Sequence, residues 1–244
     1  MKKKNKIHII LVNTQLPENL GATSRAMLNF GIEELRVVTP CFSLEHEKIL
    51  PLSAGSEIVI KKIKKFENFE SSITDLNYVL ACTARKRSSN KISFGIEEST
   101  IEVKKMLETN NKIGVVFGPE SSGLTNEHLS LVDAILKIET NPKFSSLNLS
   151  HAVMIVCYEF SKLFKKSNLK ESEKQNQGVL VRKEELVSFF FKLEKLLEKN
   201  GFIKTKERKL TIISKIRNIF NRLSLTKNEL NTLLGIVSSL TRKK

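Results

Sequence analysis

Asn19 and Arg25 follow an apolar run at 7–13 and could serve one ligand pocket. They lie six residues apart on or before an expected helix, which is close to two turns, so both side chains can face the same side. Ligands of open α/β sheets bind directly after such apolar strands. Asn19 could instead cap the helix, and Arg25 could be a solvated surface charge.

A second segment, VVFGPESSGLTNEHL (115–129), runs from an apolar strand into a loop of glycine, proline and serine. Backbone amides in such a loop face outward, and a flat ring could lie close to Gly118. Glu120 places a carboxylate in the loop. The alternative is an ordinary turn with an acidic residue near a helix start.

The third segment is IETNPKFSSLNLSHAVMIVCYE (138–159). Asn141 and Pro142 predict a turn, after which Ser145, Ser146, Leu147 and Asn148 begin a long helix. Amides and hydroxyls at the positive end of a helix can hold a ligand. Either serine could instead be only the N-cap.

The elements that must position these segments alternate between apolar strands and helical patterns. The expected strands are 7–13, 35–39, 78–83, 113–118 and 134–138. The expected helices run from Pro17 to Gly31, over 126–132 and over 145–163. This alternation predicts an α/β fold with a mostly parallel sheet covered by helices.

The last third of the chain has a different character. Residues 165–178 are polar, and three amphipathic helical patterns follow. We therefore predict three parts: a domain at 1–164, a polar linker at 165–181 and a basic helical extension at 182–244.

The net charge of +15 is concentrated in that last third. Residues 1–164 contain 21 basic and 18 acidic residues, whereas 165–244 contain 20 and 8. This asymmetry favours a phosphate-binding appendage over a generally basic surface, and so favours a nucleic-acid partner. Three separated cysteines, unclustered histidines and the lack of a long apolar run predict no disulfide framework, no metal site and no membrane span, which fits the cytoplasm.

Together the segments NLGATSRAM, VFGPESSGLTNE and NPKFSSLNLSHAV resemble motifs 1, 2 and 3 of the SpoU/TrmH branch of the SPOUT superfamily, over essentially residues 5–164. The C-terminal helices resemble those of TrmJ-type tRNA methyltransferases, which modify the ribose at position 32 of the anticodon loop. The resemblance implies a SPOUT fold with a trefoil knot over about 112–164, a homodimer and S-adenosylmethionine as cofactor.

The resemblance also assigns roles to residues. It predicts cofactor contacts from Thr83, Gly118, Glu120, Ile138, Ser146 and Leu147. It predicts a catalytic set of Arg25, Asn19, Glu120, Ser146 and Asn148. In this set Arg25 either acts as a base, held neutral with help from a phosphate, or stabilises the alkoxide that develops on the ribose. We favour the second role because it needs no extreme pKa shift. The other four residues position substrate and loops, and no metal is needed.

Two features concern the RNA. The basic loop predicts phosphate contacts from Arg85, Lys86, Arg87 and Lys91. Phe144 stands where TrmJ-type sequences often have tyrosine, so the ring is kept and the hydroxyl is lost.

The sequence thus predicts an S-adenosylmethionine-dependent tRNA 2'-O-ribose methyltransferase acting at position 32. Two alternatives stay open: a SpoU-like enzyme for another tRNA position or ribosomal RNA, and a non-catalytic RNA-binding assembly factor.

Overall fold

A computed structural model describes residues 6–85, 91–164, 179–203 and 206–241. Its centre is a seven-stranded sheet with the order β3-β2-β1-β6-β4-β7-β5, in which every pair of neighbours is parallel. The strands are β1 (Ile7–Val12), β2 (Glu34–Val38), β3 (Lys64–Phe66), β4 (Tyr78–Cys82), β5 (Ile92–Gly95), β6 (Ile113–Phe117) and β7 (Ala134–Lys137). The expected α/β fold is confirmed.

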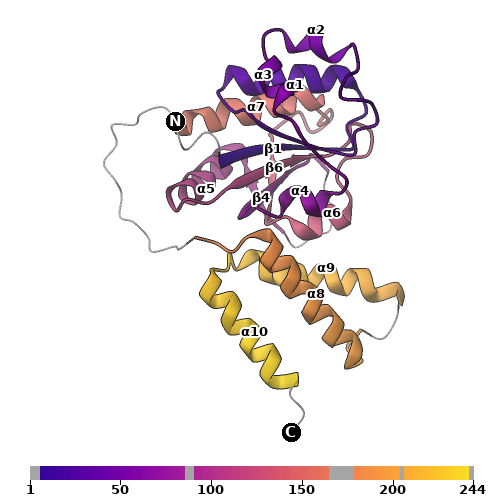
Figure 1. Ribbon diagram of the computed structural model, residues 1–244, viewed down its shortest axis with the longest axis vertical. Helices are drawn as coiled ribbons and strands as arrows, with labels where there is room; N and C mark the ends of the chain where they lie inside the picture. The colour runs from indigo at the N-terminus through magenta and orange to yellow at the C-terminus, as the bar shows by residue number, and fades with distance from the viewer. Residues whose placement is uncertain (1–5, 86–90, 165–178, 204–205, 242–244) are drawn as a thin grey trace.

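Helices cover both faces of this sheet (Figure 1). One face buries alternate strand residues such as Ile9 and Leu11 against α1 (Pro17–Asn29), α5 (Ile96–Glu108) and α7 (Leu149–Ser161). The other face packs on two short helices, α4 (Phe69–Ile73) and α6 (Asn126–Leu131). Two further short helices, α2 (Ile49–Ser53) and α3 (Glu57–Lys61), pack outside α1.

The apolar strands were predictable from burial on both faces, and all five expected strands are present. The edge strands β3 and β5 were missed because they are short and partly exposed. The long helix begins at Leu149 rather than at Ser145, and Asn148 is its N-cap. The trefoil knot stays a prediction.

Three C-terminal helices follow, as expected: α8 (Lys183–Lys199), α9 (Lys206–Arg222) and α10 (Lys227–Thr241). They form their own apolar cluster around Phe189 and Phe190, and α9 packs against α6 (Figure 1).

Polar contacts join these helices to the sheet domain. The Lys183 Nζ lies 2.6 Å from Asp133 Oδ1, with both side chains buried, and Asn221 donates to the Ser130 carbonyl at 2.9 Å. Leu180 and Val181 fall in the predicted linker but are buried, because Leu180 packs in the core of the sheet domain and Val181 in the cluster of the C-terminal helices. The Leu180 backbone is hydrogen-bonded to Asn77 and Asn111. The polar stretch 165–178 lies outside the described residues.

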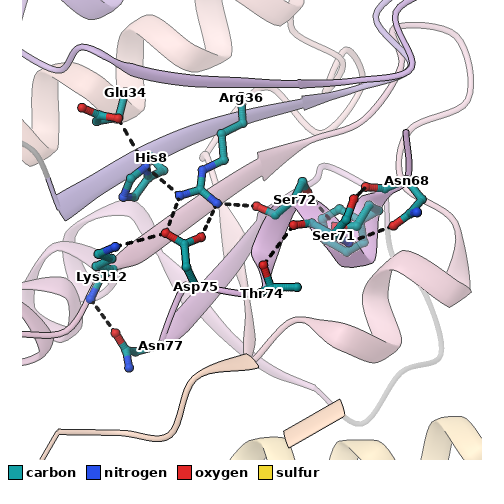
Figure 2. Close-up of polar contacts among 11 residues, drawn as sticks. His8, Glu34, Arg36, Asn68, Ser71, Ser72, Thr74, Asp75, Asn77 and Lys112 are labelled. Carbon is teal, nitrogen blue, oxygen red and sulfur yellow. Dashed lines mark hydrogen bonds and ion pairs between the residues drawn. The ribbon is translucent and has the colours of Figure 1, made fainter. Parts of the chain in front are cut away.

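The buried Arg36 of β2 is paired with Asp75, a partly exposed residue just after α4 (Figure 2). The Arg36 guanidinium donates to both oxygens of Asp75, at 2.6 and 3.0 Å, and to the Ser72 carbonyl at the end of α4. It also lies 3.2 Å from His8 Nδ1. Burial, and then the Arg36 charge, lower the pKa of His8 to about 3, so this imidazole is neutral near pH 7.

No helix within the described ranges is long and apolar enough to cross a membrane. The same part of the chain holds no group of three or more His, Cys, Asp and Glu side chains that could bind a metal ion.

Candidate functional site

A cavity of about 500 Å³ lies at the carboxyl ends of β6, β4 and β7, three strands that are neighbours in the sheet. The loop after each strand contributes to its wall, and the segment before α7 closes it. Its lining consists of Cys82, Thr83, Ala84, Arg85, Phe117, Gly118, Pro119, Glu120, Ser121, Gly123, Ile138, Thr140, Ser145, Ser146, Leu147, Leu149 and Ala152. Parallel strands therefore bring segments distant in sequence into one pocket.

All six residues expected to contact the cofactor line this cavity. They are Thr83, Gly118, Glu120, Ile138, Ser146 and Leu147. Their clustering is a property of the fold, because they come from four separate segments.

Gly118 occupies a position where no side chain fits. A Cβ atom there would lie 2.5 Å from the Leu124 nitrogen and 2.6 Å from the Gly123 carbonyl carbon. The loop after β6 therefore folds back closely on Gly118, which requires glycine at this position. The flat ring expected close to Gly118 stays a prediction.

Asn19 links the three motif segments by hydrogen bonds. Its Nδ2 donates to Glu120 Oε1 at 2.7 Å, and its Oδ1 accepts from Asn148 Nδ2 at 2.9 Å. Asn19 is buried inside α1, where Leu16 is the N-cap residue. The capping alternative for Asn19 is therefore wrong.

Asn148 has two roles. Its Oδ1 accepts from the backbone and hydroxyl of Ser150, at 2.9 and 2.7 Å, which caps α7. Its Nδ2 is the donor to Asn19. The helix start and the motif network are thus fixed by the same side chain.

Gln15 also contacts the loop after β6, and nothing in the sequence pattern indicated this contact. Its backbone N–H donates to Glu120 Oε2 at 3.0 Å, and its Oε1 accepts from the Ser121 N–H at 3.1 Å. Gln15 precedes the matched motif and sits on an irregular segment, so no periodicity marks it.

Arg85 lines the cavity, and its Nη2 donates to the Ser121 carbonyl at 2.8 Å. Of its companions in the expected phosphate-binding loop, Lys86 and Arg87 lie outside the described residues. Lys91 is buried, 8% exposed, and donates to the Val132 carbonyl. Burial lowers the pKa of Lys91 to about 7, against the attraction of Asp133, so Lys91 does not provide the exposed cation that was expected.

Of the residues expected to be catalytic, Ser146 lies in the cavity wall and Arg25 does not. Arg25 is exposed on α1 and is not part of that wall within one chain. Phe144 is 79% exposed beside the cavity segment.

Cys82 is the one thiol in the cavity wall. Burial raises its pKa to about 12, so it is protonated at neutral pH. A thiolate nucleophile is therefore disfavoured, and the site is better suited to binding and orienting than to covalent catalysis.

A second cavity, of about 420 Å³, lies at the carboxyl ends of β1 and β2 beside α4 and α6. None of the expected site residues lines it. The motif residues thus select the first cavity.

Comparison with known proteins gives two family matches. The SpoU rRNA Methylase family matches residues 6–158, and the C-terminal domain of tRNA methyltransferase TrmJ matches residues 184–244. The two matches together span both the sheet domain and the C-terminal helices.

Individual relatives match along nearly the whole chain. A Haemophilus influenzae protein named uncharacterized tRNA/rRNA methyltransferase is 32% identical, over 97% of this chain and 95% of its own length. A Sodalis glossinidius protein named tRNA (cytidine/uridine-2'-O-)-methyltransferase TrmJ is 32% identical, over 96% and 91%. The crystal structure of TrmJ from Z. mobilis superimposes with a TM-score of 0.85 at 33% identity, over 96% of this chain and 99% of that chain.

Proposed function

The chain belongs to the SpoU rRNA methylase family, and on that basis we propose that it is an S-adenosylmethionine-dependent tRNA 2'-O-ribose methyltransferase. The similarity to proteins named TrmJ over both parts of the chain favours tRNA as substrate and position 32 as target. A tRNA substrate also fits a cytoplasmic location.

The strongest support is that the second and third motif segments line one cavity and that Asn19 of the first is hydrogen-bonded to both of them. The cavity's volume of about 500 Å³ falls in the range of small-molecule sites. These residues fit S-adenosylmethionine, which supplies an electrophilic methyl group when bound. Backbone groups near Thr83, Ile138 and Leu147 would hold its adenine, as the family resemblance implies.

Arg25 is assigned the electrostatic role in the reaction. A ribose hydroxyl is a very weak acid, so a positive guanidinium next to it favours the negative charge that develops on oxygen. Arginine is charged throughout the accessible pH range, which makes it a poor base. Glu120, Asn19, Asn148 and Ser146 keep the segments in register around that oxygen.

We infer a homodimer in which the site lies near the subunit interface. Arg25 is outside the cavity wall of its own chain, so a second copy offers a route by which it reaches a cavity. Exposed apolar side chains near the cavity and on α7 support such an interface; they are Phe144, Leu147, Met154 and Tyr158.

The basic helical extension is assigned to RNA binding. Exposed cations lie on α8 and α9, among them Lys192, Lys195, Arg208, Lys215 and Arg222. Contacts of this kind to phosphates set the position of a folded RNA more than they read its sequence.

The test is to incubate the purified protein with total tRNA and S-adenosylmethionine and to map ribose methylation by mass spectrometry. We expect a 2'-O-methyl group at position 32. Methylation only at another tRNA position, or only in ribosomal RNA, would show that position 32 is not the target and that the other site is. A protein that binds tRNA without any methyl transfer would instead be a non-catalytic binding factor.

A further inference from the structure

The backbone of Ser121 is held by side chains of two other loops. Gln15 Oε1 accepts from its N–H at 3.1 Å, and Arg85 Nη2 donates to its carbonyl at 2.8 Å. We propose that Gln15 and Arg85 are positioning residues that fix the loop 118–123 for the methyl donor. This inference rests on the proposed function.

The loop has few restraints of its own. It belongs to no helix or strand, and Ser121 and Ser122 are exposed. One backbone hydrogen bond, from the Gly123 N–H to the Pro119 carbonyl at 2.9 Å, closes it internally, and Gly123 has a φ of +65°. Ordering a free backbone costs conformational entropy, so a loop fixed before the donor arrives binds it more tightly.

Gln15 also holds Glu120, the residue before Ser121. Its own backbone N–H donates to Glu120 Oε2, while Asn19 donates to Glu120 Oε1. Glu120 and Ser121 are therefore both held by the segment that leads from β1 into α1.

Arg85 lies along the opposite side of the loop. Its Nε and Cδ are 3.6 and 3.7 Å from the point where a Cβ of Gly123 would be. The side chain comes from the segment after β4 and lines the donor cavity itself. Arg85 thus joins the strand ends of β4 and β6, which differs from the phosphate contact expected from its basic surroundings.

The decisive experiment measures S-adenosylmethionine affinity by calorimetry on the full chain in the absence of RNA. Gln15→Met keeps the length of the side chain, Arg85→Met keeps the unbranched stem without the guanidinium, and each removes the side-chain hydrogen bond to Ser121. We expect each variant to raise the Kd by about 3- to 10-fold. The double variant should show less than the product of the two effects, because both act on the backbone of one residue, Ser121.

Two readouts separate positioning from a general loss of structure. The KM for S-adenosylmethionine should rise while kcat at saturating donor stays near the wild-type value. The matched control Arg208→Met removes an exposed arginine on α9 and should leave donor affinity unchanged.

If donor affinity were unchanged in both variants and only tRNA affinity and its salt dependence fell, Arg85 would be a phosphate contact and the inference would be wrong. If the wild-type protein itself failed to bind S-adenosylmethionine, the proposed function would fall together with it. Wild-type binding with unaffected variants overturns only the inference.

Discussion

Asn19 is the residue on which the geometry of the site depends most. Its side chain is buried, donates a hydrogen bond to Glu120 and accepts one from Asn148. An asparagine inside a matched motif was visible in the sequence, but the two partners lie more than a hundred residues away along the chain. Sequence spacing alone could not separate this role from a helix cap.

Asn19→Asp should lower kcat/KM by at least about tenfold, because a carboxylate would replace the donor and face Glu120. Steady-state methyl transfer to tRNA at several donor concentrations checks this expectation. Asn29→Asp is the matched control, since Asn29 is exposed at the end of the same helix. Equal losses in the two variants would count against the role of Asn19.

His8 predicts a pH dependence of stability. Its pKa is about 3 in the folded protein, below the ordinary value of 6.5, so the unfolded chain binds a proton first as the pH falls. Stability from His8 is therefore complete above about pH 6.5 and is lost toward pH 3, at up to about 1.4 kcal/mol per pH unit. Burial opposes ionisation of Asp75, but Arg36 and Lys112 hold the pKa of that carboxyl below its usual range, so its contribution is lost at lower pH.

The measurement is the melting temperature between pH 4.5 and 7. His8→Asn keeps an acceptor for Arg36 and cannot titrate, so its curve should be flatter than that of the wild type. His151→Asn, on the exposed side of α7, should follow the wild-type curve. Parallel wild-type and His8→Asn curves would contradict the assignment.

At the scale of helices and strands, the sequence predicted what burial on both faces determines. The strands β1, β4 and β6 are mostly apolar and buried and were found, whereas β3 exposes two lysines and was not. The start of α7 was predicted three to four residues too early, because several consecutive polar residues could have capped it. Contact of Asn148 with Asn19 selects the true start.

The tight packing of the loop after β6 predicts that a larger residue at Gly118 weakens donor binding. Gly118→Ala places a methyl group against the backbone of the same loop, and overpacking of this kind costs about 1–3 kcal/mol. We expect donor affinity to fall by about tenfold or more, measured by calorimetry without RNA. Gly235→Ala is the control, because a Cβ there meets no atom within 4 Å. Unchanged affinity in Gly118→Ala would show that the loop tolerates displacement.

For the whole molecule, the helical extension is a docked part rather than a freely tethered tail. Composition predicted its basic charge and its helices, but the contacts with Asp133 and Ser130 involve residues that no local pattern connects. The surroundings of Lys91 could not be predicted for the same reason. The charges that shift its pKa belong to Asp133, Lys183 and Arg222, which are distant in sequence. Deleting 165–244 would therefore bare the surface around Asp133 as well as remove cations.

Lys183→Ala should lower the free energy of unfolding by about 3–5 kcal/mol, because it leaves the buried Asp133 carboxylate without its cation. Chemical denaturation of the full chain measures this. Lys192→Ala, on the exposed side of the same helix, should change stability by no more than about 0.5 kcal/mol. Similar effects of the two variants would mean that the junction contributes little.

The account as a whole depends on a donor cavity that the second and third motif segments line, that Asn19 of the first motif holds together, and that the guanidinium of Arg25 serves. The most direct measurement compares wild type and Arg25→Ala for S-adenosylmethionine binding, tRNA binding and methyl transfer. Both proteins should bind donor and tRNA, and only the wild type should transfer methyl groups to the ribose. Transfer by Arg25→Ala at the wild-type rate, or a wild-type protein that does not bind the donor, would contradict it.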